Sequence, residues 1–127
     1  MMYVSPEFFE SASENARERY IDRVLAHVQE FFPERCQKLG AARTRDAVCY
    51  GLERGESYDL TSELDLCKFV DVMFTLGPRF DEDPEWSWTA GVLGAFPYDS
   101  TDTRMEEVFQ KVVLRLRERE QAAANQL

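Results

Sequence analysis

The segment 62–76 constrains the fold of this chain more than any other, because most of its side chains are apolar. From Leu64 onward, the polar side chains share one narrow helical face: Asp65, Lys68, Asp71 and Thr75. A helix that is apolar around most of its circumference must be enclosed by other helices. We therefore expect a central buried helix over about 62–76, which begins at a cap formed by Thr61 or Ser62 and ends at Gly77.

The rest of the chain also shows helical periodicity, since apolar residues recur at intervals of three and four. We expect helices over 6–32, 34–39 and 42–56, and a last helix that begins at 101–103 with a capping box formed by Thr103 and Glu106. No strand-like alternation persists long enough to predict a sheet. The pattern predicts an all-α fold: a single compact domain of four to five helices over 1–127, with 120–127 as a frayed tail.

Two glycines lie four residues apart in the helix expected over 42–56. Glycine in a helix interior costs about 1 kcal/mol, so each position requires a reason. A pair at this spacing would allow a second helix to approach closely. For Gly55 we favour the alternative that it helps to end the helix near Ser57.

The stretch 76–93, LGPRFDEDPEWSWTAGVL, forms the corner that follows the central helix. Asp81, Asp83 and Glu85 alternate like the opening of a calcium loop, but tryptophan and valine stand where that loop needs glycine and glutamate. Asp83 before Pro84 instead fits a capped helix start. We therefore expect these acids to begin a short helix at Pro84 or Glu85.

Trp86 and Trp88 are the two tryptophans of the chain. Side chains two apart on a helix point in different directions, so we expect one ring in the core and the other exposed. An exposed aromatic is typical of binding hot spots, whereas a buried one more often covers a small core. The later run from Arg115 to Glu120 is interpreted as a solvated helix face.

The formal charge of −9, from 24 acids and 15 bases, narrows the possible partners. A nucleic-acid interface requires a Lys/Arg footprint, and an anionic membrane also attracts basic residues. We therefore predict neither nucleic-acid nor membrane binding. A basic protein or peptide is the partner that such a charge would attract.

The cysteines and the single histidine predict no metal site. Cys36, Cys49 and Cys67 have no C-x-x-C spacing, and His27 is the only histidine. Three thiols without a disulfide framework fit a reducing compartment, and the start of the chain lacks a signal peptide, so we predict a cytoplasmic location. No phosphate loop or nucleophile motif is present, and we predict neither a cofactor nor catalytic residues.

Several motifs resemble those of one group of proteins, small helical proteins encoded beside type VI secretion effectors in Gram-negative bacteria. The resemblance covers roughly residues 20–95 and rests on His27, Phe32-Pro33, Tyr50-Gly51-Leu52, the segments 61–65 and 69–74, Leu76-Gly77-Pro78 and Phe80-Asp81-x-Asp83-Pro84. It implies an accessory protein or co-chaperone for effector loading. These motifs are structural, so the resemblance implies no active-site residues.

We therefore expect a cytoplasmic adaptor or co-chaperone that binds an effector or its chaperone. The predicted contact residues lie in the corner and near the end of the 42–56 helix: Arg79, Asp81, Glu82, Glu85, Trp86, Trp88, Glu53, Glu56 and Asp59. An immunity protein that plugs the cationic cleft of a toxin is the alternative. A small hydrolase is a weaker one, which backbone-amide bonds to both Asp81 and Asp83 would contradict.

Overall fold

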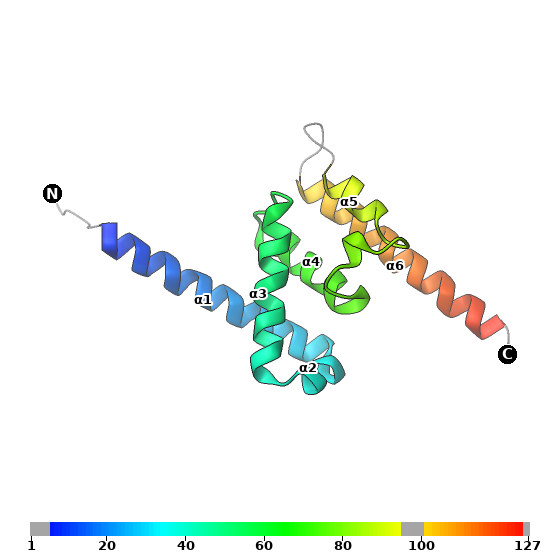
Figure 1. Cartoon of the computed structure of the whole chain (residues 1–127), viewed down its shortest axis with the longest axis horizontal. Helices are drawn as coiled ribbons and strands as arrows, with labels where there is room; N and C mark the ends of the chain where they lie inside the picture. The colour runs from blue at the N-terminus through cyan, green and yellow to red at the C-terminus, as the bar shows by residue number, and fades with distance from the viewer. Residues whose placement is uncertain (1–5, 95–100, 126–127) are drawn as a thin grey trace. The chain divides into compact units, whose positions relative to one another are not determined.

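The computed structural model describes residues 6–94 and 101–125, with the side chains of 14–94 and 103–125 (Figure 1). In this part of the chain every regular element is a helix and no strand occurs, which confirms the all-α prediction. None of the described helices is long and apolar enough to cross a membrane. The residues group into two compact units, 1–49 and 50–127, each of which is described by itself. The prediction of a single domain stays a prediction.

The first unit contains α1 (Pro6–Phe31), α2 (Pro33–Leu39) and the beginning of α3 (Ala41–Ser57). Proline has no backbone N–H to donate a helical hydrogen bond, so α1 ends before Pro33. Pro33 itself lies in the first turn of α2, where that donor is not needed. Ile21, Val24 and Val28 form the buried stripe of α1. Phe31 is exposed, at the last residue of α1.

The junction between α2 and α3 in this unit depends on Gly40, whose φ of 80° is strained for side-chain-bearing residues. The buried Thr44 hydroxyl donates to the Gly40 carbonyl over 2.8 Å. Arg45 forms ion pairs with Glu18 and Asp22, which link α3 to α1. The first unit is therefore held by a short apolar stripe and by polar contacts at its turn.

The second unit contains the rest of α3, α4 (Glu63–Leu76), the 3₁₀ turn η1 (Phe80–Glu82), α5 (Trp88–Leu93) and α6 (Thr101–Asn125). α4 is the predicted central helix. The Ser62 hydroxyl accepts a hydrogen bond from the Asp65 N–H over 3.1 Å, and Gly77 ends the helix with a φ of 119°. The described residues form six α-helices, one more than the four to five predicted.

α3 and α4 approach each other closely at the two glycines. A Cβ at Gly51 would lie 3.0 Å from the Met73 Cε, and a Cβ at Gly55 would lie 2.8 Å from a Leu66 methyl group. The close-approach interpretation is thus confirmed for Gly51. α3 ends at Ser57, as expected near Gly55, whose carbonyl accepts from the N–H groups of Tyr58 and Leu60. The missing side chain at Gly55 also makes room for Leu66.

α6 lies beside both α4 and α5. It buries Met105, Val108 and Val112, and the guanidinium of Arg104 donates to the carbonyl of Leu93 over 2.8 Å, at the end of α5. The capping box predicted at Thr103 is wrong, since α6 already begins at Thr101 and the Glu106 carboxylate bonds to side chains instead. The helix also extends through the segment expected to fray, as far as Asn125.

Candidate functional site

The corner between α4 and α5 is fixed to the core of the second unit by Phe80. Its ring is 1% exposed and lies 5.3 Å from the ring of Phe69 on α4, at a tilt of 54°. Tilted aromatic pairs at this distance add to the stabilisation from burial. Phe80 therefore anchors the corner to α4 and positions the side chains next to it in the sequence.

Asp81 follows Phe80 and is only 5% exposed. One of its carboxylate oxygens accepts hydrogen bonds from the Arg54 guanidinium and from the Tyr58 hydroxyl, both near the end of α3. Burial, followed by the hydrogen bond to Asp81, raises the pKa of Tyr58 to about 12, since both disfavour a phenolate beside a carboxylate. Asp81 was predicted to contact a partner, but its carboxylate is used to join the corner to α3.

The next acids in the corner form a turn and not a helix start. The Asp83 carboxylate accepts from the Glu85 N–H over 2.9 Å, and the Asp83 carbonyl accepts from the Trp86 N–H. α5 begins only at Trp88, so the prediction of a helix from Pro84 or Glu85 is wrong. An aspartate side chain often closes such a turn by bonding to the backbone two residues on, which competes with helix formation.

These contacts bear on the metal and hydrolase alternatives. Asp81 is bound by Arg54 and Tyr58, Asp83 by a backbone amide, and Glu85 by Arg119 of α6. The three carboxylates that alternate in the sequence therefore have three different sets of partners. Of the two backbone-amide bonds that would contradict a hydrolase, Asp83 makes one, whereas Asp81 is held by side chains.

The two tryptophans lie together, contrary to the expectation that they face different ways. Trp86 is 4% exposed, Trp88 is half-buried, and their ring centroids are 6.4 Å apart. The rule that side chains two apart on a helix point in different directions does not apply here, because Trp86 belongs to the turn before α5. The prediction that Trp86 contacts a partner is not supported by its burial, and Trp88 keeps only part of its ring exposed.

Arginines of α6 cover both rings. The Arg115 guanidinium lies 5.4 Å from the centre of the Trp86 ring and 5.2 Å from that of Trp88, and Arg119 lies 5.2 Å from Trp86. Such cation–π contacts contribute about 0.5–2 kcal/mol each, depending on exposure. The segment from Arg115 to Glu120 was interpreted as a solvated face, but these two arginines fasten α6 to the corner.

The remaining predicted contact residues are exposed. Glu53 and Glu56 lie on the last turns of α3, and Asp59 follows them in a turn with a φ of 64°, which aspartate tolerates better than most residues. Arg79 and Glu82 form an exposed ion pair within the corner. A partner can therefore reach the acids near the end of α3 and also the Arg79–Glu82 pair of the corner.

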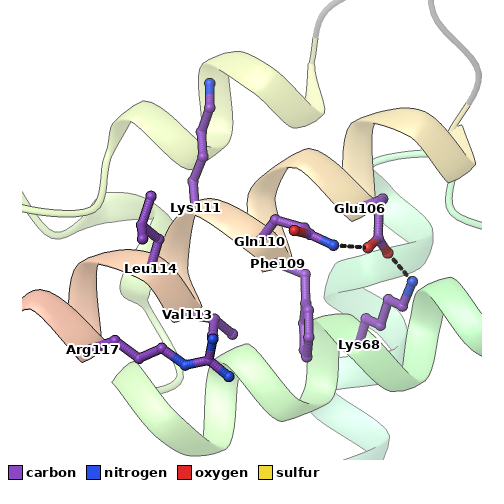
Figure 2. Close-up of a pocket in the computed structure, with 8 residues that line it drawn as sticks. All are labelled: Lys68, Glu106, Phe109, Gln110, Lys111, Val113, Leu114 and Arg117. Carbon is purple, nitrogen blue, oxygen red and sulfur yellow. Dashed lines mark hydrogen bonds and ion pairs between the residues drawn. The ribbon is translucent and has the colours of Figure 1, made fainter.

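A groove with a volume of about 500 Å³ lies beside α6 and was not predicted from the sequence (Figure 2). Lys68 of α4 reaches across to the Glu106 carboxylate, which also accepts from the Gln110 amide over 2.6 Å. These two hydrogen bonds lower the pKa of Glu106 and keep the carboxylate ionised. Leu114, which falls outside the apolar stripe of α6, was the one signal of this groove in the sequence.

The chain matches no protein-family model, no curated protein and no solved structure in the comparisons with known proteins.

Proposed function

We propose that this chain is a protein-binding adaptor or co-chaperone that captures a basic partner through the acids at the end of α3. The partner that we propose is a type VI secretion effector or its dedicated chaperone, as the motif resemblance implies. The adaptor works without catalysis, in the cytoplasm of the producing cell. The single observation that supports this proposal most is the exposure of three acids at the end of α3: Glu53, Glu56 and Asp59.

The electrostatic argument starts from the formal charge of −9. Asp81 and Glu85 are engaged by arginines of the chain itself, so they contribute little field outside the molecule. Glu53 and Glu56 lie three residues apart on one side of α3, and their charges add at the surface. Grouped charges of one sign raise the encounter rate with an oppositely charged partner, by a factor that falls steeply with added salt.

The first experiment is a pull-down of the tagged chain from its native host, with mass spectrometry of the proteins recovered at stoichiometric amounts. Recovery of a secretion effector or its chaperone would support the adaptor, and recovery of no stoichiometric partner would contradict it. Two further readouts separate the adaptor from an immunity protein. An adaptor raises effector secretion without protecting a recipient cell, whereas an immunity protein protects the recipient.

Once the partner is known, the charge argument is tested with E53K/E56K. The matched control is E118K/E120K, which makes the same change in net charge at exposed positions of α6. We expect E53K/E56K to slow association about tenfold or more at low salt, and the control to change it less than about threefold. Equal effects of the two variants would show that only the total charge matters and that the end of α3 is not the contact surface.

A further inference from the structure

The groove beside α6 has the opposite charge balance from the rest of the chain. Its lining contributes the cations Lys68, Lys111 and Arg117 against the single acid Glu106, in a chain with an excess of nine negative charges. Lys68 is paired with Glu106, and Lys111 with Glu107. Arg117 is exposed and forms no ion pair with any residue that the structure describes. The groove therefore keeps a cation that can bind an acid from outside.

The same groove presents apolar surface to solvent. Phe109 and Val113 are half-buried in its lining, and Leu114 is 58% exposed. A second depression of about 550 Å³, lined by Leu64, shares Lys68 and Glu106 with the first, and the Leu64 side chain is 64% exposed. Two adjoining depressions thus offer leucines on both sides of the Lys68–Glu106 pair. Grouped apolar surface with a polar rim is typical of an interaction site.

We propose that this groove binds an amphipathic helical segment of a partner protein, with apolar side chains against Phe109 and Leu114 and a carboxylate against Arg117. A helix laid in a groove places apolar residues at i, i+3 or i+4, and i+7 on one face, which matches an elongated site with several apolar points. The positive balance of the lining selects acidic residues beside that apolar face. The site is separate from the acids of α3 and does not depend on their role.

A second copy of the chain fits this groove less well. If two α6 helices paired antiparallel about Leu114, Lys111 of one copy would lie opposite Arg117 of the other, since both are three residues from the centre. A parallel pairing would place each of these cations opposite the same residue of the second copy. Like charges in direct opposition are destabilising, and the partner segment must therefore supply the acids.

The test uses the full chain, immobilised through a C-terminal tag, and a phage-displayed library of random 16-residue peptides. We expect enriched peptides to combine apolar residues at helical spacing with Asp or Glu. Their affinity as free synthetic peptides is then measured against wild type, L114Q, R117E and E53K/E56K. The control for charge reversal is R43E, at an exposed arginine of the first unit. Circular dichroism melts confirm that each variant is folded.

The proposal expects L114Q and R117E each to weaken binding about tenfold, while R43E and E53K/E56K change it less than about twofold. Replacing the peptide acid with lysine should restore affinity for R117E, because the charge pair is then reversed. The proposal is overturned if the enriched peptides are basic, if R43E weakens binding as much as R117E, or if no peptide is enriched. It is also overturned if sedimentation shows a dimer that L114Q dissociates, which would assign the groove to a second copy.

Discussion

The corner between α4 and α5 and the groove beside α6 both combine charged and apolar side chains but use them differently. In the corner, Asp81, Glu85 and Trp86 have partners within the chain, supplied by α3 and α6. In the groove, Leu114 and Arg117 face solvent. A stretch rich in acids and tryptophans attracts attention in the sequence, yet most of it holds the fold together. Local composition therefore identified a structural site.

The largest effect that separates the two regions is expected from W86A. The Trp86 ring is buried beneath two arginines, so its removal leaves a cavity, takes the aromatic partner of Arg119 and leaves Arg115 with Trp88 alone. Loss of a buried tryptophan costs about 3–5 kcal/mol in unfolding free energy. We expect W88A to cost less than half as much because Trp88 is half-buried. Urea unfolding monitored by circular dichroism measures both, and equal losses would contradict the different burial of the two rings.

The next largest effect is expected from D81A. Without the carboxylate, the Arg54 guanidinium and the Tyr58 hydroxyl lose their shared acceptor in a mostly buried place. We expect a loss of about 2–3 kcal/mol, somewhat below the cost of breaking a fully buried pair because Arg54 is partly exposed. The control is E82Q, next to it in an exposed ion pair, with an expected change below about 0.5 kcal/mol. If D81A were as stable as E82Q, the conclusion that the Asp81 carboxylate stabilises the fold would be wrong.

A smaller effect is expected from the ionisation of Tyr58. Its pKa is raised from 10.0 to about 12, so the native state keeps a proton that the unfolded state releases. The resulting stabilisation is complete below pH 10 and is lost as the pH rises from 10 to 12. We expect the difference in unfolding free energy between wild type and Y58F to fall by on the order of 1 kcal/mol over this range. A difference that stays constant or grows between pH 10 and 12 would place Tyr58 away from the carboxylate.

The smallest effect on stability is expected from L114Q. The side chain is 58% exposed, so replacing it with a polar residue of good helix propensity should change the unfolding free energy by less than about 0.5 kcal/mol. Thermal melts of L114Q are compared with those of V112A, which should be more destabilising because Val112 is buried on the same helix. If L114Q were as destabilising as V112A, Leu114 would belong to the core, and the groove would resemble the corner.

Much of the helical framework could be predicted because its signals are local. Apolar spacing located α1, α3, α4 and α6, and Pro33, Ser62 and Gly77 marked boundaries through their own backbone chemistry. The corner was harder, because Asp83 before Pro84 satisfies the rules for a helix start and for a turn equally well. Which of these forms depends on where Phe80 and Trp86 are buried, and burial is set by residues far along the chain.

The sequence by itself determined that this chain is helical, where most helices begin and end, and that its overall charge is strongly negative. Only the tertiary structure decided which charged and aromatic residues are used internally. Arg54 is 27 residues from Asp81, and Arg115 is 29 from Trp86, so no local pattern could pair them. Packing brings such residues together when helices bury their apolar faces. The outward side chains at the end of α3 and beside α6 are the ones that we propose for partner binding.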